Sequence, residues 1–173
     1  MARAAKLDLR TFQQELSTRL AAKTAAQVES SRLGLSCAGE RWLIRLADAS
    51  EVIALPTVVS VPLTRAWFMG VANIRGNLYS VIDFSVFLGH EPAPLSGMTR
   101  LIVFGPRAGD LNAGIVVNRV LGLRNVSELA PAAPPVGKPD WYAQRWMDGD
   151  GNAWQEIDLA RLARDPAFLQ VGA

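Results

Sequence analysis

The 173-residue sequence is poor in the residues from which catalytic and metal centres are usually built. It has one cysteine, Cys37, and one histidine, His90, so neither an intrachain disulfide nor a site with two imidazole ligands can form. No glycine cluster leads into a helix in the way that a phosphate-binding loop or a dinucleotide fingerprint requires. We therefore expect no enzymatic activity, no cofactor and no metal ion.

The sequence also lacks a secretory signal and any apolar run long enough to cross a bilayer, so we expect a cytoplasmic protein without direct membrane insertion. Its net charge is only +2. Residues 1–32 hold six Lys or Arg against three acidic residues, and the remainder holds twelve against thirteen. Such a balanced body reveals no concentrated basic surface in its sequence, so we expect no nucleic-acid partner.

Half of the residues are hydrophobic and a fifth are charged, which is typical of a folded protein with a packed core. The length favours one compact body with appendages. We expect a helical arm over residues 1–30, a body over 31–168 and a tail over 169–173. Helical spacing of the apolar residues Leu9, Phe12, Leu16 and Leu20 in the arm predicts an amphipathic helix. Packing of this stripe on the body is favoured over binding of a partner, because helices usually gain their stability from packing in their own domain.

From residue 33 the hydrophobic period changes to two, which predicts β-strands. A first hairpin with a two-residue loop at Gly39 and Glu40 would place its apolar residues on one face. The pairs expected from that loop are Cys37–Trp42, Leu35–Ile44 and Leu33–Leu46.

A second hairpin is predicted over residues 71–83, with Gly76 and Asn77 as its loop. That loop would pair Ile74 with Tyr79 and Ala72 with Val81, leaving Arg75 on the opposite face.

Further strands are expected at 100–104 and 112–123, and a last pair brackets the turn at 148–152. The Pro-rich stretch 130–140 cannot continue a central strand, so we expect an ordered connection there. In all, the pattern predicts roughly ten short strands and a mainly β fold.

Two segments, 81–88 and 156–163, share the order strand, Asp, short helix. Asp83 and Asp158 are suited to accept hydrogen bonds from the first free amides of those helices, so we interpret both as helix caps. Cys37 is expected in the core, and His90 in a surface loop.

The turn at 148–152 resembles the start of a calcium-binding loop. However, Ala153 stands where the loop needs glycine, and Leu159 stands where it needs the closing glutamate. A hairpin turn is the better interpretation.

The stretch WFMGVANIRGNLYSVIDF, residues 67–84, resembles the signature of CheW-type coupling domains, and the flanking strands extend the similarity over about residues 31–165. The resemblance implies two packed five-stranded SH3-like β-barrels and a non-enzymatic adaptor. Its expected partners are the regulatory domain of a CheA-type histidine kinase and the cytoplasmic tip of a chemoreceptor, which would enter the groove between the barrels. The N-terminal arm and the particular residues of the signature are most similar to the PilI branch, whose members serve type IV pilus chemosensory systems that control twitching motility. The resemblance therefore implies a cytoplasmic protein associated with membrane-bound receptor arrays.

The resemblance also implies partner-binding residues. Arg75 matches the family's receptor-coupling arginine, Gly70 the glycine that opens its strand, and Glu51 the acidic residue of an early strand. Val117 and Val120 match the late strand that helps to line the groove. Asn118, which follows Val117, departs from the family's usual Asp, and this removes a negative charge from a surface that recognises partners.

Two other classes of function compete with the adaptor. A small barrel can bind single-stranded nucleic acid through aromatic and basic side chains, although the near-neutral body disfavours this. An enzyme or ligand sensor could place its site between the barrels among four aromatic residues, which we instead expect to fill the core or the interface between barrels. These aromatic residues are Trp141, Tyr142, Trp146 and Trp154.

Overall fold

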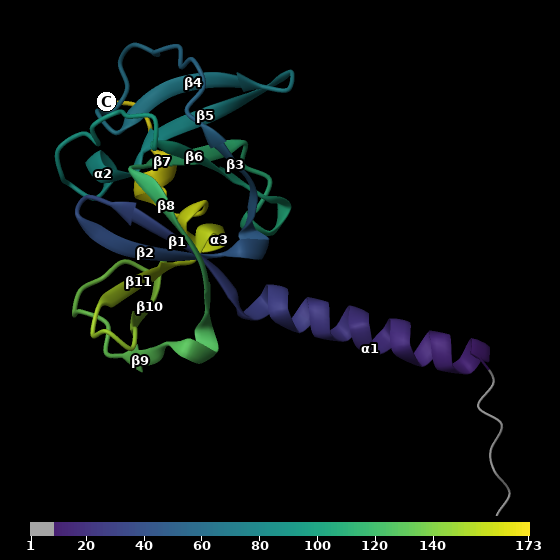
Figure 1. Cartoon of the computed structure of the whole chain (residues 1–173). Coiled ribbons are helices and arrows are strands. Elements are labelled where there is room, and N and C mark those ends of the chain that lie inside the picture. The colour runs from purple at the N-terminus through teal and green to yellow at the C-terminus, as the bar shows by residue number, and fades with distance from the viewer. Residues whose placement is uncertain (1–8) are drawn as a thin grey trace, which may run out of the picture.

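A computed structural model describes the backbone of residues 9–173 and the side chains from residue 13 onward. It opens with a 22-residue helix, α1 (Leu9–Ser30), which projects from a β-rich body (Figure 1). The helix predicted for the arm is therefore present, but Leu9 and Phe12 of the expected stripe lie outside the described side chains. No helix within residues 9–173 combines the length and the apolar character needed to cross a membrane.

The body contains two sheets. The first has six strands in the order β8-β1-β2-β11-β10-β9, and all neighbouring pairs are antiparallel except β2 with β11. The strands are β1 (Ser31–Cys37), β2 (Glu40–Arg45), β8 (Arg119–Asn125), β9 (Ala130–Ala132), β10 (Tyr142–Met147) and β11 (Ala153–Ile157).

The second sheet has five strands in the order β3-β6-β7-β5-β4. Its two ends meet because Val59, beyond the end of β3, exchanges two backbone hydrogen bonds of 2.8 and 2.9 Å with Val71 of β4. This closes the sheet into a barrel. The strands are β3 (Ala49–Ala54), β4 (Phe68–Ile74), β5 (Asn77–Asp83), β6 (Arg100–Phe104) and β7 (Ala113–Val117).

The expected fold of two packed β units is confirmed, with one additional strand. The short strand β9 lies inside the Pro-rich connection and includes Pro131, which an edge strand tolerates because one of its sides needs no hydrogen bonds.

Short helical turns connect the strands. The two predicted caps are confirmed: Asp83 accepts hydrogen bonds from the backbone N–H groups of Ser85 and Val86, and Asp158 accepts one from Arg161. The turns are η1 (Leu46–Asp48), α2 (Phe84–Phe87), η2 (Pro106–Ala108), η3 (Val126–Glu128), α3 (Leu159–Leu162) and α4 (Pro166–Leu169).

Both predicted hairpins are present, but each loop lies one residue earlier than the sequence pattern indicated. The first loop is Ala38-Gly39, and the second is Arg75-Gly76. A two-residue loop of the type that suits twisted hairpins needs positive φ at both of its residues, and these four residues supply it. The observed pairs are therefore Leu33–Ile44, Leu35–Trp42 and Cys37–Glu40 in the first hairpin, and Ala72–Tyr79 and Ile74–Asn77 in the second.

The strand expected over 112–123 is divided at Asn118. Its first part, β7, belongs to the five-stranded sheet, and its second part, β8, belongs to the six-stranded sheet. Asn118 donates its backbone N–H to the carbonyl of Ser36, and its side-chain oxygen accepts from the N–H of Ala38. One continuous apolar pattern thus crosses from one barrel to the other.

Three hydrophobic clusters follow from the alternation of side chains along the strands. On β2, Leu43 faces a small cluster inside the six-stranded sheet, whereas its neighbours Trp42 and Ile44 face the other barrel. On β7, Val116 faces the interior of the five-stranded barrel, whereas Ile115 faces the six-stranded barrel. The largest cluster therefore lies between the barrels and holds them together.

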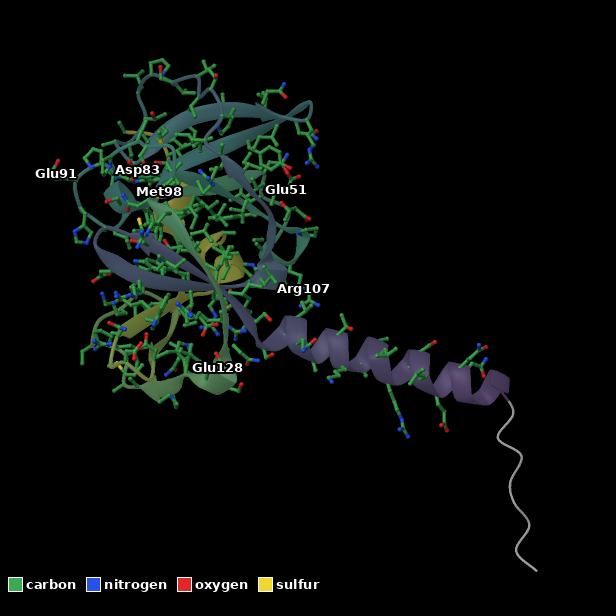
Figure 2. All side chains as sticks on the ribbon, viewed as in Figure 1. Glu51, Asp83, Glu91, Met98, Arg107 and Glu128 are labelled. Carbon is green, nitrogen blue, oxygen red and sulfur yellow. The ribbon has the colours of Figure 1, made fainter. Side chains whose placement is uncertain are left out.

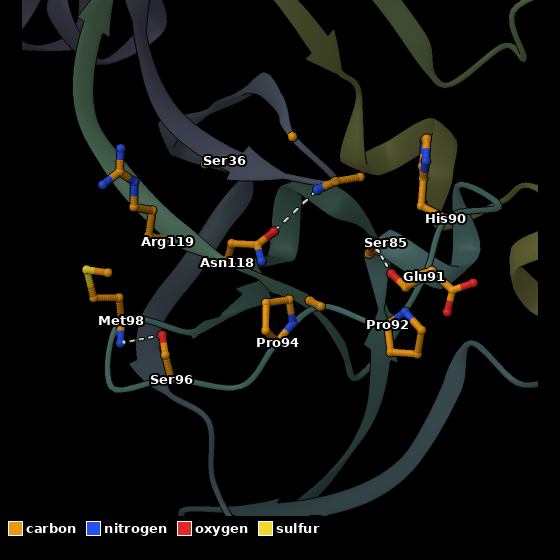
Figure 3. Close-up of a pocket in the computed structure, with 13 residues that line it drawn as sticks. Ser36, Ser85, His90, Glu91, Pro92, Pro94, Ser96, Met98, Asn118 and Arg119 are labelled. Atoms are coloured by element: carbon orange, nitrogen blue, oxygen red, sulfur yellow. Dashed lines mark hydrogen bonds between the residues drawn. The ribbon is translucent and has the colours of Figure 1, made fainter.

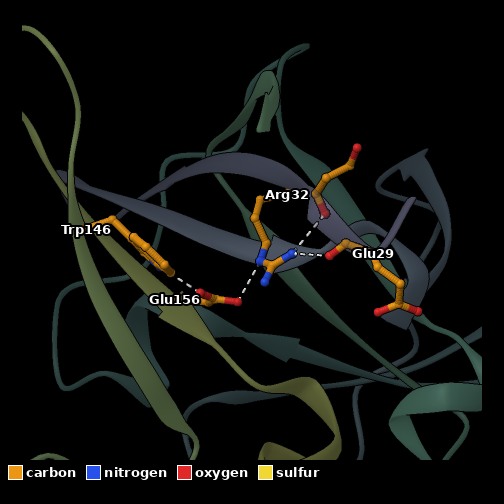
Figure 4. A network of polar contacts seen from close by, with 5 residues as sticks. Glu29, Arg32, Trp146 and Glu156 are labelled. Carbon is orange, nitrogen blue, oxygen red and sulfur yellow. Dashed lines mark hydrogen bonds and ion pairs between the residues drawn. The ribbon is translucent and has the colours of Figure 1, made fainter. Parts of the chain in front are cut away.

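The base of α1 is fastened to both barrels. Arg32 is buried at the start of β1 and donates a hydrogen bond of 2.8 Å to the carbonyl oxygen of Glu29 at the end of the helix. Its guanidinium also forms an ion pair, at 2.6 Å, with the buried carboxylate of Glu156 on β11 (Figure 4). Glu156 also accepts 2.7 Å from the indole N–H of Trp146. The side chain of Glu29 pairs with Arg107 in η2, which follows β6 of the other barrel.

Beyond this base the helix stands free. The side chains of residues 13–29 are exposed, including Leu16 and Leu20 of the predicted stripe. For residues 13–29 the expectation that the arm packs on the body is therefore wrong, because among the described side chains of α1 only those of its last turn contact the body.

The C-terminal residues are tied to the body. Gly172 forms a β-bridge with Thr64, and the N–H of Ala173 donates to the carbonyl of Leu63. The segment expected as a tail thus pairs with the loop that precedes β4.

Candidate partner-binding sites

Arg75 lies at the tip of the β4–β5 hairpin. Its backbone has φ of +50°, and the following Gly76 donates its N–H to the side-chain oxygen of Asn73 at 2.9 Å, which fixes the turn. The guanidinium of Arg75 pairs at 2.9 Å with the carboxylate of Glu51 on β3. With 79% of the Arg75 side chain exposed, most of its five N–H donors remain open to a partner.

The structure therefore brings together two residues that the sequence analysis named separately. The ion pair joins the hairpin tip to β3 across the five-stranded barrel, and Glu51 is 27% exposed. One carboxylate oxygen orients the guanidinium, so the arginine is held in place without being buried.

Gly70 is buried, and its role is architectural. It has φ of +134°, and a Cβ at this position would lie 2.0 Å from the carbonyl oxygen of Val59. Only glycine allows the segment around Val59 to approach β4 closely enough for the two hydrogen bonds that close the barrel. Gly70 therefore positions the hairpin that carries Arg75.

The two valines carried over from the family resemblance have different environments. Val117 is fully buried in the cluster between the barrels, so its side chain cannot contact a partner, and we withdraw it from the candidate site. Val120 on β8 is half-buried and lines a hollow between the barrels, where Met98 and Arg100 form the opposite wall. The resemblance implied the same role for both valines, because the division of the strand at Asn118 is not visible in the sequence.

A larger hollow of about 770 Å³ continues from Met98 and Arg119 (Figure 3). One wall is formed by the loop after α2, where the hydroxyl of Ser85 donates to the carbonyl of Glu91 at 2.7 Å. The opposite wall includes Asn118, which stands where the family usually has Asp. The lining residues are Ser36, Ala38, Gly39, Ser85, His90, Glu91, Pro92, Ala93, Pro94, Ser96, Met98, Asn118 and Arg119.

The ion pair and this hollow lie on different parts of the surface. Figure 2 shows Glu51 on one side of the upper barrel and Met98 on the other. Met98 and Arg119 could not be predicted from the sequence as part of one site, because neither belongs to a motif and they come together only when the barrels pack.

The residues tested for chemistry have structural environments. Burial raises the pKa of the Cys37 thiol to about 12, so it carries its proton at neutral pH and is a poor nucleophile. His90 is exposed on the wall of the hollow, as expected. Asp148 accepts hydrogen bonds from the indole of Trp154 and from backbone and side-chain N–H groups of its own turn, which lower its pKa, and the predicted hairpin turn is confirmed.

The aromatic residues considered for a ligand site fill the interior instead. Trp141 and Tyr142 are buried in the cluster between the barrels, and Trp154 is buried inside the six-stranded sheet. Trp146 packs against the latter cluster and donates its N–H to Glu156. The molecule is thus a double-barrel module in which two barrels share an aromatic core. Its exposed arginine at a hairpin tip and its open hollows at the seam suit the binding of other proteins.

Comparison with known proteins gives the family. The CheW-like domain family matches residues 32–167, so the chain belongs to the CheW-like domain family. It is 32% identical over 162 residues to protein PilI of Pseudomonas aeruginosa, covering 88% of each chain. It is 34% identical over 87 residues to protein FrzA of Myxococcus xanthus, covering 50% of this chain and 53% of FrzA.

A solved structure agrees on the fold. The scaffolding protein TtCheW of Thermoanaerobacter tengcongensis superposes with a TM-score of 0.64 at 20% identity, covering 75% of this chain and 89% of TtCheW. The similarity to the PilI branch that the signature indicated is confirmed by the relative from Pseudomonas aeruginosa.

Proposed function

We propose that this protein is a non-enzymatic adaptor that joins the cytoplasmic tip of a methyl-accepting chemoreceptor to the regulatory domain of a CheA-type histidine kinase. Membership of the CheW-like family and the fold shared with a scaffolding protein support a scaffold role. The finer assignment of the two partners rests on the family resemblance of the 67–84 signature and on the surfaces described above.

Arg75 is the observation that carries the proposal. It stands in the signature, at the tip of a tight hairpin, with its guanidinium oriented by Glu51 and largely exposed. Such an arginine contributes little to stability because a solvent-exposed ion pair is worth about 0.2–1 kcal/mol. It can instead give a partner's carboxylate or carbonyl a planar set of donors, which is typical of residues that determine interface specificity.

The receptor tip would contact Arg75 and would also reach the seam between the barrels, which lies on a different part of the surface. Val120, Met98 and Arg119 offer it apolar contacts and one positive charge. The hollows are open and wide, which suits the side chains of another protein better than a small molecule that must be enclosed. Asn118 lines the same seam, and its uncharged amide would favour a receptor surface without a basic residue at that point.

The similarity to PilI over 88% of both chains supports a place in a chemosensory system that controls type IV pili and twitching motility. In that role the adaptor would work in the cytoplasm, associated with membrane-bound receptor arrays. We propose no nucleic-acid partner and no cofactor.

The test is a pull-down of the purified protein with the kinase regulatory domain and with a receptor cytoplasmic hairpin. Arg75→Ala is compared with Arg164→Ala, an exposed arginine after α3. We expect the wild type to bind both partners, and Arg75→Ala to weaken receptor binding by at least about fivefold, or about 1 kcal/mol, with unchanged thermal unfolding. Normal assembly by Arg75→Ala, or binding of neither partner by the wild type, would overturn the proposal.

A further inference from the structure

One edge of the six-stranded sheet is open. Strand β8 pairs with β1 on one side, and within residues 9–173 no strand pairs with its other side. Figure 1 shows β8 crossing the front of the molecule from one barrel to the other. The backbone N–H and C=O groups along a free edge form a template to which another extended chain can add.

Arginines frame this edge. Residues directly opposite one another in a sheet share a face, and two rows of such residues cross β8, β1 and β2. Read across the three strands, the rows are Arg119–Ser36–Arg41 and Arg124–Arg32–Arg45.

The charge of this face is not balanced by the protein itself. Arg32 is neutralised by Glu156 in the buried pair. The other four arginines are exposed, and none forms an ion pair with a carboxylate in the part of the chain that the structure describes. The face therefore carries an unpaired positive charge of four beside an open strand.

Two of these arginines are held in place by a buried ring. The guanidinium carbons of Arg124 and Arg41 lie 5.2 and 5.9 Å from the ring centroid of Trp154. Trp154 is only 2% exposed and packs on Gly34, where a Cβ would come within 3.0 Å of the indole. A stacked guanidinium keeps its N–H donors and loses less side-chain freedom on binding.

We propose that the free edge of β8 binds an extended acidic segment of a partner protein, which adds as a further strand and places carboxylates opposite Arg119 and Arg124. The register shift in the pairing of β8 with β1 determines the spacing of the partner's two carboxylates. Arg119 and Arg124 are five residues apart, yet they oppose Ser36 and Arg32, which are four apart on β1. A regular partner strand therefore presents its two carboxylates at positions i and i+4.

The same features argue against other occupants. A second copy would bring arginine edges together, and like charges that face each other across strands are unfavourable. Single-stranded nucleic acid needs aromatic platforms, and within the described residues the exposed large apolar side chains include no aromatic. A peptide matches both the alternating backbone groups and the charge.

The experiment uses the full chain and a fluorescent nine-residue peptide. The peptide alternates valine with polar residues and carries glutamates at its third and seventh positions. Fluorescence anisotropy measures its dissociation constant at low and high salt. We expect saturable binding that weakens with salt and is lost when both glutamates are replaced by lysine.

Two N-methylated versions of the peptide test strand addition. One carries methyl groups on its odd-numbered amides and the other on its even-numbered amides. Since alternate amides point to opposite edges of a strand, one version should bind like the parent and the other should not bind. Equal binding of the two versions, or tighter binding of a thymidine oligonucleotide than of the peptide, overturns the proposal.

Protein variants test the arginines. Arg119→Gln and Arg124→Gln should each weaken binding by about two- to fivefold, as expected for one cross-strand charge pair. The matched control, Arg164→Gln, should leave it unchanged. Loss of affinity in the control equal to that in Arg119→Gln would show that net charge alone attracts the peptide and would overturn the site. Arg119 also borders the seam assigned to the receptor tip, but neither kinase nor receptor is used, so failure of this site and failure of the adaptor proposal can be distinguished.

Discussion

Replacement of Gly70 by alanine should open the five-stranded barrel. A Cβ at this position would lie 2.0 Å from the carbonyl oxygen of Val59 and 2.7 Å from its carbonyl carbon, which are backbone atoms that no rotamer change can move. The segment around Val59 must therefore retreat from β4. Its two reciprocal hydrogen bonds with Val71 would be lost.

The size of the effect follows from two contributions. A non-glycine residue held in a sparsely populated region of backbone space costs about 1–3 kcal/mol. Loss of two backbone hydrogen bonds adds about 0.5–1.5 kcal/mol each. Gly70→Ala should therefore destabilise the protein by about 2–6 kcal/mol, which is a large part of the stability of an ordinary domain.

The assay is urea unfolding followed by tryptophan fluorescence, with Gly39→Ala as the control. Gly39 also has positive φ, at +74°, but nothing lies within 4 Å of a Cβ there, so only the backbone strain of about 1–2 kcal/mol applies. If Gly70→Ala costs no more than Gly39→Ala, the close approach does not limit the fold. If it loses receptor binding while its stability is unchanged, Gly70 acts at the interface and the architectural role is wrong.

Three further predictions concern the interior. Arg32→Met should lower the free energy of unfolding in urea by about 3–5 kcal/mol, because it leaves the buried Glu156 carboxylate unpaired. Adding Glu156→Gln should recover part of this loss. Equal stability of the single and double variants would contradict the pairing. Gly34→Ala should push the indole of Trp154 away from the sheet and alter the near-UV circular dichroism, and an unchanged spectrum would count against the close contact. Because the folded pKa of Cys37, about 12, lies above its ordinary value of 9.0, the unfolded thiol loses its proton first as pH rises. Its contribution to stability is complete below pH 9 and should be lost between pH 9 and 12, by up to about 1.4 kcal/mol per pH unit relative to Cys37→Ala; parallel pH profiles of the two proteins would refute this.

The sequence predicted the elements well where the period and the turn chemistry agreed. Alternation located both early hairpins, and the aspartates at 83 and 158 correctly marked the starts of short helices. The sequence pattern predicts the loops Gly39-Glu40 and Gly76-Asn77, each one residue later than the loop in the structure. The chain instead places Ala38 and Arg75 in the left-handed region, which a sequence pattern alone disfavours.

The candidate site was only partly predictable. Arg75 and Glu51 were named from the resemblance, but their ion pair depends on the packing of a hairpin tip against a strand 24 positions earlier in the chain. Val117 was named from the resemblance as well, but its side chain is buried between the barrels, and a match to a family strand does not show whether a side chain meets a partner or another barrel.

The sequence by itself determined the mainly β character, the family signature and the positions of most strands, because these depend on local periodicity and on turn residues close together in the chain. Tertiary structure alone decided which strands share a sheet, which faces meet between the barrels and which edge stays open. It also decided that α1 stands away from the body, anchored at its base by Arg32 and Glu29. These outcomes depend on contacts between distant segments, where burial and charge pairing are set by the partner that packing supplies.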